Sequence, residues 1–234
     1  MKDKLVVIHQ PDFMPYLGFF QRLIEADIYI VLDNVQYVRG TSKAQTNRDK
    51  IKTVKGEQWI NVGIQKSTFK SRINEIQLSK ENQWRERSLN LIKENYRKAD
   101  YFSEVYPYIE ELYALECDRM IDFNMASIHM LIKLFGIDDI EIKYASELSV
   151  AGKSNELIIN LVKAVGCHRY LSGVGAKNYY IPELYEEAGI EVEWQKFEHP
   201  VYKQQFGEFI PYLSSIDLLL NCGIEQSREI IRNC

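Results

Sequence analysis

The feature that most constrains the fold is a short apolar strand that runs directly into a polar, proline-containing turn. Leu5 to Ile8 form a continuous apolar run, which is typical of a strand buried on both faces. The run ends in His9-Gln10-Pro11-Asp12, and a segment with apolar residues at helical spacing follows over residues 18–26. Side chains at the carboxyl end of such a strand face the crevice in which α/β proteins bind ligands. The segment therefore predicts an α/β fold and locates a candidate site.

A second buried strand follows the first after this short helix. Ile28 to Leu32 are again apolar throughout, and the run ends in Asp33-Asn34-Val35-Gln36. Two such strands joined by a short helix predict a parallel pair with a right-handed crossover. We therefore expect Asp33 and Gln36 to lie beside His9 at one edge of the sheet.

The rest of the chain divides into three parts. Residues 1–80 form an N-terminal α/β part, 81–137 a helical block, and 138–234 a C-terminal α/β part, which we expect to form one integrated domain with the first. Further strands are predicted over residues 59–64, 73–78, 140–144, 169–172 and 192–197. Helices are predicted as three segments between about 82 and 135, and then over 154–165, 178–188 and 214–222, with Gly223 ending the last and a short helix after it. The pattern predicts a mostly parallel, Rossmann-like sheet flanked by helices, with the helical block in the middle.

Composition and charge exclude several classes of protein. With 234 residues, 46% of them hydrophobic and 26% charged, the chain has the composition of a soluble globular protein. The net charge is −4 and no basic tract occurs, so we expect no nucleic-acid partner. No apolar run approaches the length of a signal segment or a membrane span. We expect a cytoplasmic protein without a membrane partner, and the sequence leaves a homo-oligomer open.

Metal and nucleophile motifs are absent from the sequence. The four cysteines form no CxxC pair, and neither HExxH nor GxSxG occurs. We therefore expect no metal, no cofactor and reduced thiols. The 15 tyrosines are more informative, because tyrosine combines an apolar ring with a polar tip and suits clefts as well as cores.

The first candidate site residues follow the first strand. His9, Gln10 and Asp12 form a polar trio suited to an anionic or hydroxylated ligand, with His9 as acid or base. In the alternative interpretation His9 bonds the backbone and the prolines only shape the turn. Arg22, on the first helix, either reaches a phosphate or carboxylate with both of its terminal nitrogens or pairs with a nearby acidic side chain.

Further candidates follow the second strand. Asp33 and Gln36 are suited to orienting His9 or a ligand, although Asp33-Asn34 is also a common turn sequence. Residues 38–54 are polar and basic and predict a loop over the strand ends. Arg48 in this loop either clamps a phosphate or is simply solvated.

The C-terminal part offers two more groups. Gly173 and Gly175 follow a strand and open a helix, so their backbone amides can face an anion, or they only form a tight turn. His199, Tyr202 and Gln204 follow the last predicted strand. A second strand-end histidine predicts one cleft that is lined from both halves of the chain.

Several of these segments resemble the WbqC-like protein family. The resemblance is carried by Ile8-His9-Gln10-Pro11-Asp12-Phe13-Met14-Pro15-Tyr16-Leu17-Gly18, Asp33-Asn34-Val35-Gln36-Tyr37, Asn47-Arg48, His199-Pro200-Val201-Tyr202-Lys203-Gln204 and residues 213–223. It covers nearly the whole chain. Members are associated with bacterial O-antigen and other surface-polysaccharide gene clusters, which implies work on sugar precursors.

The opening of the chain is also similar to HUP-type nucleotidyltransferases and pantothenate synthetase-like enzymes. Those enzymes use a histidine motif at this turn to hold nucleotide phosphates. Here Pro15-Tyr16-Leu17-Gly18 stands where their second histidine is expected. The similarity implies a HUP-like fold and, as one alternative, nucleotidyl transfer.

Together these features predict an enzyme that transfers a small acyl or aminoacyl group to a nucleotide-linked amino sugar. In this hypothesis His9 is the general base and Asp33 orients it, while Arg48 and the turn at Gly173–Gly175 hold the diphosphate. His199, with its two polar neighbours, recognises the sugar or the donor. The alternatives are a nucleotidyltransferase-like enzyme, a non-catalytic sugar-nucleotide-binding protein and an interaction scaffold.

Overall fold

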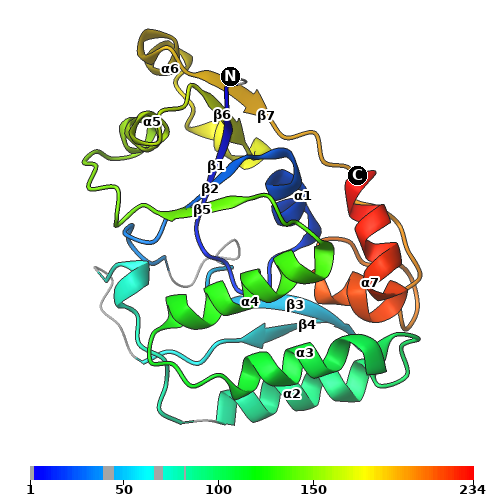
Figure 1. Cartoon of the computed structure of the whole chain (residues 1–234). Helices are drawn as coiled ribbons and strands as arrows, with labels where there is room; N and C mark the ends of the chain where they lie inside the picture. The colour runs from blue at the N-terminus through cyan, green and yellow to red at the C-terminus, as the bar shows by residue number, and fades with distance from the viewer. Residues whose placement is uncertain (1–2, 39–44, 66–70, 82) are drawn as a thin grey trace.

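The computed structural model describes residues 3–38, 45–65, 71–81 and 83–234 (Figure 1). Its strands are β1 (Leu5–His9), β2 (Ile28–Val31), β3 (Arg48–Thr53), β4 (Gly56–Asn61), β5 (Glu141–Tyr144), β6 (Arg169–Ser172) and β7 (Glu191–Trp194). Its helices are α1 (Leu17–Glu25), α2 (Gln83–Tyr96), α3 (Phe102–Ala114), α4 (Met120–Phe135), α5 (Asn155–Ala164), α6 (Pro182–Ala188) and α7 (Ile216–Arg232). Two short 3-10 helices, η1 (Ile73–Glu75) and η2 (Val174–Asn178), complete the described elements.

Five of the strands form one parallel sheet in the order β5-β2-β1-β6-β7. The predicted α/β class, with a Rossmann-like parallel sheet flanked by helices, is confirmed. From β1 the chain builds outward through β2 and β5, and then crosses over to build β6 and β7 on the other side. The strand order therefore reverses between β1 and β6. This reversal is the topological switch point, where open α/β sheets bind their ligands.

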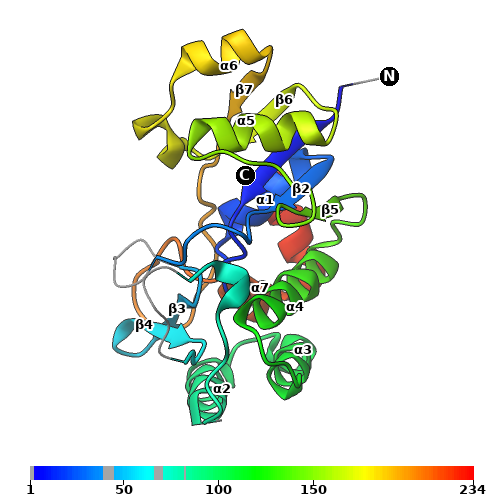
Figure 2. The same cartoon turned by 90° about the vertical axis from the view of Figure 1, so that its left-hand side faces the viewer.

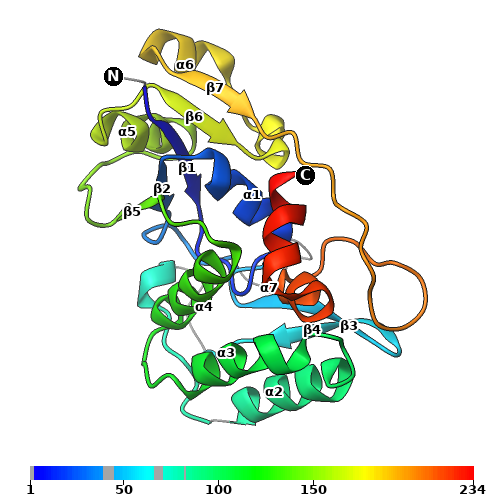
Figure 3. The same cartoon turned by 45° about the vertical axis from the view of Figure 1, so that its right-hand side comes forward.

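Both faces of the central strands are buried, which explains why these strands are apolar throughout. Leu5 and Val7 belong to the core formed with α1 and α7, and Figure 3 shows these two helices side by side. Val6 and Ile8 point the other way and pack in a second core with α5 and α6. In Figure 2, α5 and α6 lie at the opposite end of the molecule from the β3–β4 hairpin and α2. Because side chains alternate along a strand, one run of residues supplies both cores.

The β3–β4 hairpin and helices α2–α4 lie beyond the carboxyl ends of β1 and β2 (Figure 1). β3 pairs antiparallel with β4, so the prediction of a loop over residues 38–54 is wrong for 48–53, while residues 39–44 lie outside the described part. The predicted strand over 73–78 is also wrong, because Ile73 opens a 3-10 turn instead. That turn places Ile73 and Ile76 on one side, and both are buried.

Other boundaries differ from the predictions in smaller ways. The expected helix over 178–188 is η2 followed by α6, which begins at Pro182. The strand expected to reach residue 197 ends at Trp194. The break predicted at Gly223 is confirmed: its φ is 78°, and a Cβ there would lie 2.5 Å from the ring of Tyr101.

A single hydrophobic core contains residues from all three parts of the chain. The helical block predicted between the two α/β parts is confirmed as α2, α3 and α4. The exact boundaries at residues 80 and 137 stay a prediction. Within the described ranges, no helix combines the length and apolarity needed to cross a membrane.

Candidate functional site

A cavity of about 610 Å³ opens at the carboxyl ends of the central strands. Its walls come from the ends of β1, β2, β6 and β7, from the first turn of α5, from the segments around η2, and from residues in 35–38 and 45–46. The cavity lies where the strand order reverses between β1 and β6. It therefore occupies the position that the first strand and its polar turn predicted.

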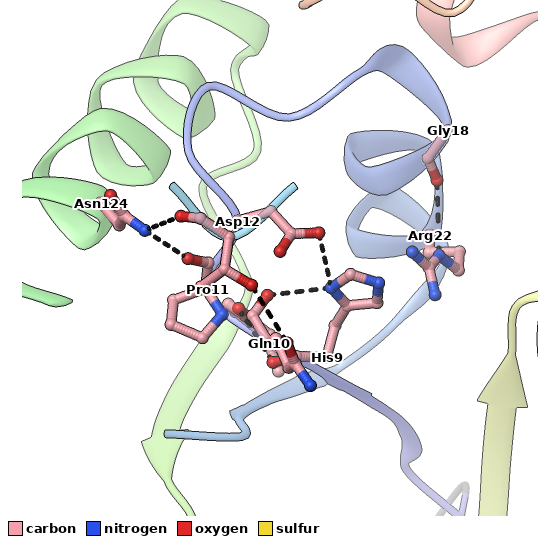
Figure 4. A network of polar contacts seen from close by, with 9 residues as sticks. His9, Gln10, Pro11, Asp12, Gly18, Arg22 and Asn124 are labelled. Atoms are coloured by element: carbon pink, nitrogen blue, oxygen red, sulfur yellow. Dashed lines mark hydrogen bonds and ion pairs between the residues drawn. The ribbon is translucent and has the colours of Figure 1, made fainter. Parts of the chain in front are cut away.

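One wall of the cavity is polar and carries His9 and Asp12 (Figure 4). His9 Nδ1 lies 2.9 Å from the carbonyl oxygen of Gln10 and 3.7 Å from Asp12 Oδ2. A carbonyl only accepts, so Nδ1 carries the proton and Nε2 is left as an acceptor. The turn is held in place by Asn124, whose Nδ2 donates to the carbonyl of Pro11 at 2.7 Å.

Burial shifts the two titrating groups of this wall in opposite directions. Burial, and then the positive charge of Arg22, lowers the pKa of His9 to about 3. Burial raises the pKa of Asp12 to about 7. At neutral pH the imidazole is therefore neutral, and the Asp12 carboxyl group can both release and accept a proton. The sequence hypothesis gave the proton-transfer role to His9, but the lowered pKa of His9 and the raised pKa of Asp12 make Asp12 the better candidate for that role.

A second wall of the cavity is aromatic, and sequence reasoning did not predict it. It consists of Tyr170, Tyr179, Tyr180, Tyr185 and Trp194. The ring of Tyr180 meets the ring of Trp194 edge to face at 5.1 Å between centroids, and Tyr185 at 5.0 Å. Tyr179 is 63% exposed and stands at the rim. The only signal in the sequence was the abundance of tyrosine, which suits clefts without saying where the cleft is.

The start of α5 also contributes to the cavity. Its lining residues are Ser154, Asn155, Leu157 and Ile158. Asn155 Nδ2 donates to the carbonyl oxygen of Tyr179 at 3.0 Å, which ties the aromatic segment to α5.

Four predicted site residues line this cavity: His9, Gln10, Asp12 and Gln36. Gly173 and Gly175 are not among the lining residues, although their neighbours Ser172 and Ala176 are. Arg22, in the last turn of α1, lies beside the imidazole of His9, on the side away from Asp12 (Figure 4).

Asp33 lies in a different environment. Its carboxylate accepts hydrogen bonds from the Ser146 backbone N–H at 2.9 Å, the Ser146 hydroxyl at 2.6 Å and Asn74 Nδ2 at 3.2 Å. It lines a separate hollow of about 220 Å³ together with Arg119 and Asp122. The carboxylate beside His9 is therefore that of Asp12. Arg48, on β3, places its guanidinium 4.2 Å above the ring of Trp59 and is not among the residues that line the cavity.

The structure does not bring His199 to the cavity. Its Nδ1 lies 2.9 Å from the carbonyl oxygen of Pro200, and its ring packs against those of Phe197, Tyr202, Phe209 and Tyr212. Nε2 is buried in this cluster and has no hydrogen-bond partner among the residues that the structure describes. Because β7 ends at Trp194, His199 does not stand at a strand end.

Tyr202 and Gln204 also lie outside the cavity lining. Both donate to Oδ2 of Asp217 at 2.8 Å, so they belong to a buried network on α7. Among the described residues, no group of three or more histidine, cysteine, aspartate or glutamate side chains is placed to hold a metal ion. The four cysteines are free.

Comparison with known proteins gives a relative and a family. The chain is 29% identical to the uncharacterized protein Rv1507c of Mycobacterium tuberculosis (strain ATCC 25618 / H37Rv), over 99% of each chain. No solved structure matches the chain. The model of the WbqC-like protein family matches residues 10–229, and the chain therefore belongs to that family.

Proposed function

We propose that this protein is a transferase that moves a small acyl or aminoacyl group onto the amine of a nucleotide-linked amino sugar. The observation that carries the proposal is the cavity at the switch point. Its lining contains Asp12, which can exchange a proton near neutral pH, next to the neutral imidazole of His9, and it also contains a group of aromatic rings. The association of WbqC-like proteins with surface-polysaccharide gene clusters supports a sugar precursor as the substrate.

The size and walls of the cavity suit a ligand of this kind. Its volume of about 610 Å³ lies inside the range of roughly 300–1,000 Å³ that is typical of small-molecule sites. Tyrosine and tryptophan rings bind the flat face of a nucleobase or the apolar face of a sugar ring, while their polar tips donate hydrogen bonds. Gln10 and Gln36 add neutral polar groups that can bind hydroxyls.

The reaction moves one proton and replaces the ester or thioester bond of the donor with a carbon–nitrogen bond to the acceptor. The acceptor amine attacks the carbonyl carbon of an activated ester or thioester donor, and a carbon–nitrogen bond forms. The Asp12 carboxylate takes the proton that the amine loses. It then delivers this proton to the leaving alcohol or thiol as the bond between the carbonyl carbon and the leaving group breaks. His9 Nε2 accepts a hydrogen bond from the acceptor and positions it.

The test is direct measurement of transfer. The purified protein is incubated with nucleotide-linked amino sugars and with aminoacyl or acyl thioester donors. The masses of the sugar nucleotides are then measured by mass spectrometry. We expect a mass gain equal to one acyl group. Asp12→Asn should slow turnover by about 10²- to 10⁴-fold, and His9→Ala should slow it as well, while Asp100→Asn, an exposed control, should leave it unchanged.

Two other results would replace the proposal. Release of pyrophosphate from ATP or CTP, dependent on the same two residues, would make the protein a nucleotidyltransferase. Thermal stabilisation by a sugar nucleotide without any product, across all donors, would make it a binding protein.

A further inference from the structure

Within the part of the chain that the structure describes, Arg22 is a buried cation without an anionic partner. Its exposed fraction is 4%, and it lies in the last turn of α1. Among the described residues its guanidinium makes one hydrogen bond, from Nε to the carbonyl oxygen of Gly18 at 3.4 Å, and no ion pair. Neither Nη atom is among the sealed, unpartnered polar atoms, so both keep some access to solvent. A buried charge without a partner costs several kcal/mol, and this charge therefore needs an explanation.

The guanidinium lies at the switch point of the sheet. A Cβ atom on Gly173, which follows β6 directly, would lie only 3.1 Å from Arg22 Nη1. The absence of a side chain at Gly173 thus leaves room for the guanidinium between the end of β6 and the end of β1. On the β1 side it stands next to the imidazole of His9, on the far side from Asp12 (Figure 4). Its Nε shares the carbonyl oxygen of Gly18 with Gln195 Nε2, which donates to it at 2.7 Å.

The charge of Arg22 is felt inside the cavity. Burial is the largest influence on the pKa values of His9, Asp12 and Tyr170, and the positive charge of Arg22 acts to lower each of the three. All three residues line the cavity. Neutral His9 and a half-protonated Asp12 do not supply a full countercharge at neutral pH.

We propose that Arg22 is the anion-binding residue of the site and holds the diphosphate of the ligand in the crevice between β1 and β6. The planar guanidinium presents two Nη groups that can donate in parallel to phosphate oxygens. This position replaces the earlier expectation that Arg48 binds the diphosphate. The choice of a diphosphate over another oxyanion rests on the proposed function, because a nucleotide-linked sugar carries one.

The test is binding of sodium pyrophosphate to the full chain, measured by isothermal titration calorimetry without acceptor or donor. We expect the wild type to bind, and Arg22→Met to weaken binding by about 30-fold or more. Arg22→Lys, which keeps the charge but loses the fork, should fall between them. Arg87→Met removes an exposed arginine from α2 and should bind like the wild type.

Thermal unfolding without ligand gives a second readout. If the role of Arg22 is to bind an anion, its charge is unpaired in the ligand-free protein. Arg22→Met should then melt at a higher temperature than the wild type, because the variant no longer buries an unpaired charge. A merely structural arginine would give the opposite result. Should Arg22→Met fail to fold, Gly173→Ala is the second variant for the binding measurement. Its methyl group would lie 3.1 Å from Arg22 Nη1, so the guanidinium must shift and pyrophosphate binding should weaken.

Several outcomes would overturn the proposal. These are equal pyrophosphate binding by the wild type and Arg22→Met, no binding by the wild type, or Arg22-dependent binding of malonate without binding of pyrophosphate. Failure of the proposed function is distinguishable, because it would appear as absent transfer while Arg22-dependent pyrophosphate binding persists.

Discussion

Two buried aspartates, Asp12 and Asp217, differ in how completely their carboxylates are hydrogen-bonded. Asp217 lies in the first turn of α7 and is fully buried. Its oxygens accept from the hydroxyl of Tyr96 at 2.6 Å, the hydroxyl of Tyr202 at 2.8 Å and Nε2 of Gln204 at 2.8 Å. With Asn221 Nδ2 at 3.5 Å from Oδ1, each oxygen of this carboxylate has two donors from the protein itself.

Asp12 has the opposite surroundings. It borders the cavity, and its neighbour His9 lies at 3.7 Å, outside hydrogen-bond range. Burial raises its pKa to about 7, against the lowering effects of a hydrogen bond with Thr46 and of the positive charge of Arg22. A buried carboxylate with free hydrogen-bonding capacity next to a cavity is available for chemistry, whereas a saturated one holds the structure together.

The contrast divides the segments that resemble the family into two kinds. The N-terminal block forms one wall of the cavity. The C-terminal blocks fasten the segment between β7 and α7: Lys52 Nζ donates to Gln204 Oε1 at 3.0 Å, and Gln204 also bonds both backbone groups of Ile210. Both kinds contain histidine, aspartate and glutamine, and only the structure separates them.

Asp217→Ala should have the largest effect on stability of the changes considered. It leaves the hydroxyls of Tyr96 and Tyr202 and the amide of Gln204 buried without their acceptor. We expect the free energy of unfolding to fall by about 5 kcal/mol, measured by urea denaturation. Asp12→Ala is the matched change and should not lower it. Equal losses in the two variants would abolish the distinction between a structural and an available carboxylate.

The pH dependence of stability should carry the signature of Asp12. Its pKa in the folded protein, about 7, is above the ordinary 3.8. The folded state therefore favours the protonated form of Asp12. The contribution of this group to the free energy of unfolding is fully present below pH 3.8 and is lost as the pH rises through 7. Asp12→Asn removes this loss. We expect the stability of the variant relative to the wild type to grow by about 3 kcal/mol between pH 5 and pH 8.

Asp49 is also buried with a raised pKa, and the charge of Asp12 is one cause of that rise, so part of the pH dependence of this difference passes through Asp49. Urea titrations at four or five pH values between 5 and 8 give the curve. A difference that stays constant over this range would show that Asp12 is not protonated in the folded protein near neutrality.

His9 should give a dependence of the opposite sign. Its pKa falls from the ordinary 6.5 to about 3 on folding, so its contribution to stability is present above pH 6.5 and is lost as the pH falls toward 3. Relative to His9→Gln, the wild type should lose about 2 kcal/mol between pH 7 and pH 5. The measurement is again urea denaturation at each pH. Parallel curves for the two proteins would mean that the pKa of His9 is the same in the folded protein as in the unfolded chain.

The part of the site that the sequence predicted depends on local pattern. β1 and β2 are continuous apolar runs joined by a short helix, and parallel neighbours bring their carboxyl ends to one edge. That is why His9, Gln10, Asp12 and Gln36 could be expected together before the structure was known. Their expected partner Asp33 follows the same strand end but turns to Ser146, a contact that no local pattern encodes.

The missed parts depend on contacts between distant segments. β3 contains Arg48, Lys50 and Lys52, and its sequence therefore predicts a polar loop. Lys52 is nevertheless only 2% exposed, because it packs against the segment that contains Gln204. The aromatic wall comes from several elements between β6 and β7, so no periodic pattern marks it. His199 was expected at the site because the last strand was predicted to run to Phe197, which would place His199 at the carboxyl end of the sheet. The strand, β7, ends at Trp194 instead.

The smallest effect separates two tyrosines, one from each region. Tyr202→Phe removes one of the hydrogen bonds to the saturated carboxylate of Asp217 and should cost about 1.5 kcal/mol of the free energy of unfolding. Tyr179→Phe, at the exposed rim of the cavity, should change the free energy of unfolding by less than about 0.5 kcal/mol. This variant should instead bind the sugar nucleotide that the transfer assay identifies more weakly than the wild type, as measured by titration. If Tyr202→Phe weakened that binding while leaving stability intact, the C-terminal block would belong to the site after all, because a purely structural hydrogen bond acts on folding and not on an empty cavity elsewhere.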